Sequence, residues 1–275
     1  MNRILRGAEA TWTNQYRVMS AYAFAKDTDM QSNPPPILNL SDPTGVVKEI
    51  FDDDKWVKDG FTKHFSVELL AFGETLAESF KRYPKLDAMA KGEDEQALYV
   101  FAFIHAVFDD LITSTKLLVT GKMVPSGNLV RQALEGMVMA VLCSSRKMVL
   151  IPTNSGKNSV PVKYWELVKA SDRRVESHKA IGHLELNRTQ FSVSKYAIDE
   201  LRRGITKYHQ FSHPSIATLV ARVRQTENGI TPFIGGVFNE AMMPMYKFEI
   251  EQRTNLSRIL PNLIDLVITH LNAPR

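Results

Sequence analysis

Cysteine is almost absent from this chain, because Cys143 is its one cysteine in 275 residues. A single cysteine excludes an intrachain disulfide and a cysteine-rich zinc site. It stands within the apolar run GMVMAVLCSS, so we expect a buried thiol. The lack of disulfides favours a reducing compartment, and we predict a cytoplasmic protein.

Long hydrophobic runs are missing too. The longest uncharged stretch in an apolar region is Gln96–Phe108, which is too short to span a bilayer. The first residues, MNRILRGAEATW, contain two arginines with no apolar run behind them, which argues against a signal peptide. The sequence therefore predicts a soluble protein without a membrane segment.

Recognisable motifs for cofactors and metals are also lacking. Ser155–Ser159 reads SGKNS but does not have the glycine spacing of a P-loop, and no Rossmann fingerprint occurs. His209 and His213 could supply two zinc ligands, but no HExxH motif or nearby acidic partner completes the set. No helix carries the Glu-x-x-His motifs of a di-metal bundle. We predict neither a metal nor a cofactor.

Charge is spread unevenly although the net charge is only +4. Ser41–Asp110 holds 15 acidic and 8 basic residues, whereas Lys163–Arg224 holds 12 basic and 6 acidic residues and four of the seven histidines. A basic segment can attract phosphate, as in RNA or another anionic ligand. Alternatively, the two segments complement each other within one chain or across a homo-oligomer.

Helical periodicity runs through nearly the whole chain. Two segments, Glu93–Thr120 and Asn128–Met148, are apolar over much of their length and should form the centre. The stretch ENGITPFIGGVFN predicts a short hairpin-like loop near residues 229–238, since its glycines permit positive φ. The predicted helices cover Thr11–Lys26, 43 to about 58, Phe65–Tyr83, Glu93–Thr120, Asn128–Met148, Val162–Leu184, Ser192–Phe211, 214 to about 223, and 239 to about 271.

No repeat of fixed period and no boundary between independent domains is visible. We therefore predict an all-α fold, a single-domain multi-helix bundle at residues 41–275. Residues 1–40 contain the first predicted helix and a proline-rich stretch, DTDMQSNPPPILNL, which denies helix and favours an extended arm.

A cluster of basic and imidazole side chains marks residues 201–219, LRRGITKYHQFSHPSIATL. On a helix, Arg202, His209 and His213 share a face, while Arg203 lies on another. Pro214 should end that helix. A guanidinium can hold a phosphate, and an imidazole can move a proton near neutral pH.

This arrangement resembles the R-x(4–6)-H motif of the HEPN superfamily of small helical bundles. Arg202 and Arg203 precede His209 with six and five residues between, and Arg173–His178 also fits the spacing. The resemblance implies a metal-independent endoribonuclease of a defence or toxin system. There the arginine and histidine of two protomers converge across a dimer interface, and the 2′-hydroxyl of the RNA performs the attack. Tyr208 and His213 would support the site.

A second resemblance comes from NLVRQALEGMVMAVLCSS and, far downstream, YHQFSHPS. Both stretches look like those of large, uncharacterised helical bacterial families that are grouped with HEPN-like or abortive-infection proteins. Arg131 and Glu135 are four residues apart and can pair along one helix. Their apolar surroundings predict a partly buried polar network that reaches His209 or Tyr208, although a simple intrahelical pair is the alternative.

Two functions from different classes follow. The first is a HEPN-like bundle that binds a ligand or partner without catalysis, in which His209 and His213 are structural. The alternative is the endoribonuclease, in which Arg202 or Arg203 holds the phosphate and His209 moves the proton. We prefer the first on the sequence alone.

Overall fold

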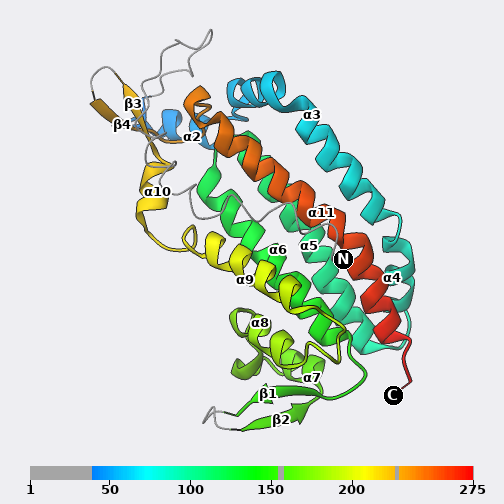
Figure 1. The fold of residues 1–275 in the computed structure, drawn as a ribbon. Coiled ribbons are helices and arrows are strands. Elements are labelled where there is room, and N and C mark those ends of the chain that lie inside the picture. Colours follow the sequence, from blue (N-terminus) through cyan, green and yellow to red (C-terminus); the bar gives the residue numbers. More distant parts are fainter. Residues whose placement is uncertain (1–38, 154–157, 227–228, 275) are drawn as a thin grey trace.

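The computed structural model describes residues 39–153, 158–226 and 229–274, and the fold is all-α. Four long helices run side by side: α3 (Lys55–Phe80), α5 (Glu95–Val119), α6 (Met123–Ser144) and α11 (Met243–Leu271) (Figure 1). α5 and α6 follow each other in the chain, and α11 packs against α3, α5 and α6. The predicted all-α, multi-helix bundle is confirmed.

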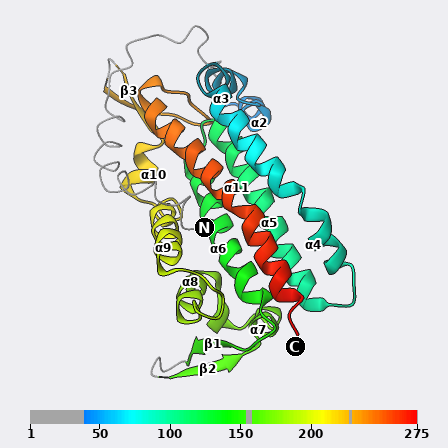
Figure 2. The same ribbon diagram turned by 45° about the vertical axis from the view of Figure 1, so that its right-hand side comes forward.

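Shorter elements surround these four helices (Figures 1 and 2). α4 (Tyr83–Ala90) packs on α5, and both α8 (Ser177–Leu186) and α9 (Lys195–His209) pack on α6. One end of the bundle carries α7 (Tyr164–Lys169), η2 (Arg173–Val175) and the antiparallel hairpin of β1 (Val149–Pro152) and β2 (Ser159–Val162). The other end carries α2 (Pro43–Phe51), α10 (Ile216–Val220), η3 (Glu240–Met242) and a second hairpin, β3 (Val223–Thr226) and β4 (Gly229–Pro232).

α6 is the most enclosed helix of the bundle. Every residue from Met137 to Ser144 is buried, which includes the thiol of Cys143. Burial raises the pKa of that thiol well above its ordinary value. The long apolar run seen in the sequence is therefore explained by neighbours on all sides of the helix.

α5 is apolar but buries only one face. Val100, Ile104 and Leu111 are fully buried, whereas Leu98 is 49% exposed. Within residues 39–153, 158–226 and 229–274, α5 is the one helix that length and composition alone would allow to cross a membrane. Its apolar inner face is occupied by α6.

The corner between α5 and α6 depends on glycine. The N–H groups of Gly121 and Lys122 bond to the carbonyls of Leu118 and Leu117, which is a Schellman motif, and Gly121 has φ of +73°. A Cβ on Gly121 would lie 2.4 Å from the nitrogen of Val237, and one on Gly236 would lie 1.7 Å from the Thr120 carbonyl oxygen. The loop before η3 therefore presses directly on this corner.

Both hairpins differ from the sequence-based expectation. No element is predicted between the helices Asn128–Met148 and Val162–Leu184, but β1 and β2 pair there, with Val149 and Ile151 buried. The expected hairpin near 229–238 begins earlier, because the paired residues are 223–226 and 229–232. In both cases, two short strands are too brief for alternation to reveal them.

Several helix ends also differ. The helix predicted from residue 43 to about 58 is interrupted after Phe51, where Asp54 adopts φ of +49° and α3 then begins. The helix predicted to end at Tyr83 ends at Phe80 as α3, and Pro84 lies in the first turn of α4, where the missing N–H of proline costs nothing. The same reasoning lets α6 begin at Met123 with Pro125 in its first turn. The predicted helix Thr11–Lys26 lies outside the described residues, as does nearly all of the 1–40 arm.

The orientation of α5 gives the first prediction. Replacing Ile104 by alanine should lower the free energy of unfolding by about 2–5 kcal/mol, because it opens a cavity against α6. Leu98→Ala, on the same helix but facing out, should cost less than about 1 kcal/mol. Denaturant unfolding measures both, and equal losses at the two positions would contradict the packing described.

Candidate functional site

α9 carries four of the residues that the sequence singles out, and it holds both arginines in ion pairs. Arg202 donates to Glu185 on α8, with Nη2–Oε2 at 2.6 Å, and lies 3.7 Å from Asp199. Arg203 contacts the carboxylate of Glu200 on its own helix. Both guanidinium groups are therefore already neutralised by carboxylates of the chain.

His209 and His213 come together at the C-terminal end of α9. Both side chains are exposed, and their ring centroids are 5.0 Å apart in an edge-to-face arrangement. Arg202 lies seven residues before His209, which is about 10 Å along the helix axis. Among the described side chains, no hydrogen bond or ion pair joins either arginine to either histidine. The structure thus brings the two imidazoles together and leaves the guanidinium groups apart from them.

Arg131 and Glu135 pair along α6 as the spacing predicts. Arg131 Nε lies 2.8 Å from Glu135 Oε1, and both side chains are mostly buried. Their partners outside the helix are serines: Arg131 Nη1 donates to Ser212 Oγ at 2.9 Å, and Ser177 Oγ donates to Glu135 Oε2 at 2.6 Å. The network ties α6 to α8 and to the turn after α9, where the Ser212 N–H bonds the carbonyl of His209, and no hydrogen bond between described side chains joins it to His209 or Tyr208.

Tyr208 belongs to a different polar network, which is buried between α9 and α11. Its ring is 1% exposed and its hydroxyl donates to Glu249 Oε2 at 2.8 Å. Lys207 Nζ donates to Glu249 Oε1 at 2.9 Å, and Arg253 Nη1 lies 2.9 Å from Glu249 Oε2. One buried carboxylate on α11 therefore binds two cations and a phenol.

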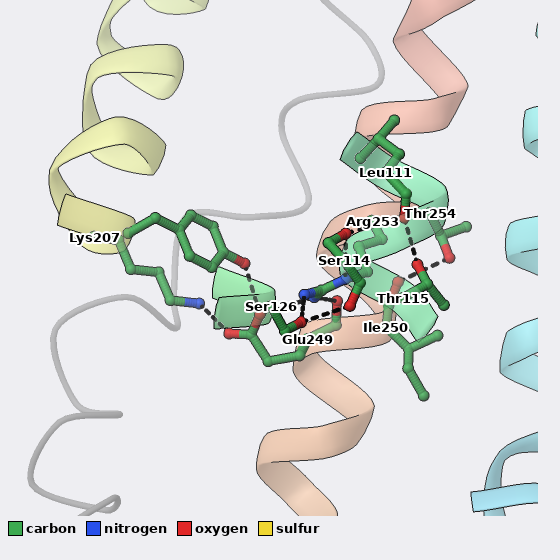
Figure 3. A network of polar contacts seen from close by, with 10 residues as sticks. Leu111, Ser114, Thr115, Ser126, Lys207, Glu249, Ile250, Arg253 and Thr254 are labelled. Atoms are coloured by element: carbon green, nitrogen blue, oxygen red, sulfur yellow. Dashed lines mark hydrogen bonds and ion pairs between the residues drawn. The ribbon is translucent and has the colours of Figure 1, made fainter. Parts of the chain in front are cut away.

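The network continues from Arg253 into α6 and α5. Arg253 Nη2 donates to Ser126 Oγ at 2.5 Å and Nε to Ser114 Oγ at 3.3 Å, while Nη1 also bonds the Glu249 carbonyl. Ser126 Oγ in turn donates to the carbonyl of Ser114. Four helices, α5, α6, α9 and α11, are joined through a fully buried guanidinium (Figure 3).

The ionisation of this network follows from its burial. Burial alone would raise the pKa of Glu249, but attraction and hydrogen bonds from Lys207 and Arg253 outweigh it and lower that pKa to about 2. Burial lowers the pKa of Lys207, and the attraction of Glu249 opposes this. Lys207 Nζ also lies 3.7 Å from the centroid of the Phe248 ring, a cation–π contact.

Sequence reasoning missed Lys207, Glu249 and Arg253. One signal was available, because Glu249 and Arg253 are four residues apart on a predicted helix, as Arg131 and Glu135 are. Nothing local in the sequence indicates that Lys207, on another helix, completes the set.

A groove opens next to Tyr208, between α9 and α11. Its volume is about 150 Å³, its floor is α6, and α8 contributes one side chain at its end. Most of the lining is aliphatic: Leu134, Met137, Val138 and Val141 from α6, Leu184 from α8, Val193, Ala197, Leu201 and Gly204 in and before α9, and Leu256, Ile259, Leu263 and Leu266 from α11.

The polar lining of the groove is sparse. Gln252, Asn255 and Asn262 lie on α11, and Glu200 lies on α9 with a side chain only 9% exposed. Glu200 contacts Arg203, so its charge is balanced within the protein. Across the described ranges, no group of three or more histidine, cysteine or acidic side chains is placed to hold a metal ion. The groove is thus suited to apolar contact with a few hydrogen bonds at its edge.

No family model, curated protein or solved structure matches the chain. The likeness to HEPN proteins consequently depends on the short motifs of α9 and α6 alone.

The buried network gives the second prediction. Glu249→Gln should lower the free energy of unfolding by about 3–5 kcal/mol at pH 7, because Lys207 and Arg253 lose their buried counter-charge. The pKa of Glu249 is depressed in the folded state, so its carboxylate stabilises the fold above the unfolded pKa of about 4.3, and that stabilisation is lost as pH falls toward 2.

The difference between wild type and Glu249→Gln should therefore shrink when denaturant unfolding is repeated between pH 5 and pH 3. The exposed neighbour Glu251 provides the control, since Glu251→Gln should have little effect at any of these pH values. A difference that stays constant with pH would show that Glu249 is not ionised in the fold.

Proposed function

We propose that this protein binds a small apolar ligand in the groove between α6, α8, α9 and α11. The observation that carries the proposal is an aliphatic groove of about 150 Å³ on the described bundle. A ligand that fills the groove removes its aliphatic lining from water, which is favourable.

The lining defines the class of ligand. An apolar cavity of about this volume accepts a molecule the size of benzene. The Glu200–Arg203 pair balances its own charge, so the lining attracts neither a strong anion nor a strong cation. The side chains of Gln252, Asn255 and Asn262 offer hydrogen bonds along the α11 edge. We therefore infer a neutral ligand, with one aromatic ring or a branched alkyl group and a single polar end.

Leu263→Asp tests this function. Leu263 is a half-buried wall of the groove, and a carboxylate there should repel a neutral apolar probe. Calorimetric titration with 4-ethylphenol, which has one aromatic ring and one polar end, should show at least tenfold weaker binding to this variant than to wild type, about 1.4 kcal/mol. Leu70→Asp, the same change at an exposed site on α3, should leave binding unchanged.

Thermal unfolding establishes that both variants remain folded, and the milder Leu263→Asn should weaken binding in the same direction. Equal affinity in all three variants would place the probe elsewhere and contradict the proposed site.

The second candidate function is the metal-independent endoribonuclease that the HEPN resemblance implies. Its support is the exposed pair of His209 and His213 rings, 5.0 Å apart and open to a ligand. An RNA phosphate would have to displace Glu185 or Glu200 to reach Arg202 or Arg203. A homodimer would be needed to bring an arginine of one protomer to the histidines of the other.

This candidate predicts cleavage of single-stranded RNA in the presence of EDTA. His209→Ala should slow cleavage by about 10²–10⁴-fold, because proton transfer would lose its side chain. The exposed His178, which follows Arg173 with four residues between and so also fits the motif, provides the control, and His178→Ala should cleave normally. RNA left intact by the wild-type protein would exclude this activity.

A further inference from the structure

One end of the groove meets the buried network around Glu249. Tyr208 is the last residue of α9 in the lining, and Gln252 is the first residue of α11. Glu249 lies three residues before Gln252, which is less than one turn away along α11. Tyr208 lines the groove, and its hydroxyl donates to Glu249 Oε2 at 2.8 Å. One side chain is therefore shared by the groove and the network.

The α9 wall of the groove is attached to different neighbours on its two sides. Away from α11, the helix packs on α6 and α8. Towards α11, Lys207 and Tyr208 donate to Glu249 at 2.9 and 2.8 Å. From Tyr208 the wall continues to Ala197, about 16 Å along the helix axis, with the groove between α9 and α11. The bonds to Glu249 therefore set how far this wall stands from α11.

The hydroxyl of Tyr208 contributes direction rather than charge to this contact. Tyr208 is 1% exposed and the Glu249 side chain is 4% exposed, so water does not readily replace a lost donor. Lys207 and Arg253 still meet the charge of Glu249 when the hydroxyl is absent. The substitution Tyr208→Phe should therefore leave the protein folded while it frees the α9 wall to shift.

We propose that Tyr208 is a positioning residue of the groove, whose hydroxyl acts through Glu249 to hold the α9 wall at the distance from α11 that a bound ring requires. This inference rests on the proposed function, because it concerns the affinity of the same groove. Ligand binding is then coupled to the buried network, since a ligand that fills the groove favours the position of α9 in which the Tyr208–Glu249 bond is made. By the same linkage, loss of that bond weakens ligand binding.

Calorimetric titration with 4-ethylphenol tests the coupling. Tyr208→Phe keeps the ring that lines the groove and removes only the hydroxyl. We expect this variant to bind the compound at least about fivefold more weakly than wild type, which is the lower end of the couplings measured between sites in proteins. Affinity equal to that of wild type would overturn the proposal.

Tyr246→Phe provides the matched control. Tyr246 is also buried, and its hydroxyl bonds the Asn239 N–H at 3.3 Å and the Val237 carbonyl at 3.5 Å, but it does not line the groove. Its loss should lower the melting temperature and change the affinity for 4-ethylphenol by less than about twofold, because the two positions act independently. Equal weakening in Tyr208→Phe and Tyr246→Phe would indicate a general loosening of the core and would contradict a positioning role.

Ethylbenzene separates positioning from direct contact. It has the ring and the ethyl group of 4-ethylphenol without a polar end, so it cannot exchange a hydrogen bond with the Tyr208 hydroxyl. Positioning predicts that Tyr208→Phe weakens the binding of both compounds by the same factor. Weakening of 4-ethylphenol alone would show that the hydroxyl bonds the ligand itself, and the role through Glu249 would then be wrong.

Leu263→Asp distinguishes a failure of this inference from a failure of the groove function. If Leu263→Asp weakens the binding of 4-ethylphenol while Tyr208→Phe leaves it at the wild-type value, only the role of Tyr208 is overturned. If Leu263→Asp leaves the affinity unchanged, the compound binds elsewhere, and the groove function is overturned together with the role of Tyr208.

Discussion

The placement of Glu249 between Lys207 and Arg253 is the interaction on which the arrangement of the bundle depends. A carboxylate buried in a helical core is unfavourable unless its charge is met, and here two cations and a tyrosine hydroxyl meet it. The three donors come from α9 and α11, and Arg253 extends the contact to Ser126 on α6 and Ser114 on α5. Since apolar packing alone tolerates sliding of one helix on another, these directional bonds fix the position of α9.

That position creates the groove. Tyr208 bonds Glu249 through its hydroxyl and lines the groove with its ring. α9 is thus tied to α11 at the Tyr208 end, and along the rest of their length the groove separates the two helices, with α6 as its floor. The Arg131–Glu135 pair on α6 stabilises the same region, because it bonds Ser177 on α8 and Ser212 in the turn after α9. The lining of the groove is consequently apolar although polar networks surround it.

The two central helices could be predicted from the sequence, whereas the site could not. The predicted helix Val162–Leu184 was wrong, because that segment is divided into the end of β2, α7, η2 and α8. The apolar segments around Ile104 and Met137 predict buried helices, because periodicity and apolarity can be read from neighbouring residues alone. The pairing of Arg131 with Glu135 is local in the same sense. Lys207 and Tyr208 lie 42 and 41 residues before Glu249 in the chain. Their contacts with Glu249 depend on how α9 and α11 are placed relative to each other. Arg202 and His209 share one predicted helix face, yet the carboxylate of Glu185, on another helix, decides where the guanidinium goes. The β1–β2 hairpin escaped prediction because four-residue strands offer too few alternations.

The glycine pair at the α5–α6 corner bears on how distant homologues of this protein can be recognised. Gly121 and Gly236 approach other backbone atoms so closely that any larger residue would force the corner and the loop apart. Core positions can exchange one aliphatic residue for another, but these two positions accept only glycine. A remote homologue could therefore lose almost every resemblance in its helices and still be recognised by glycines at these two widely separated positions.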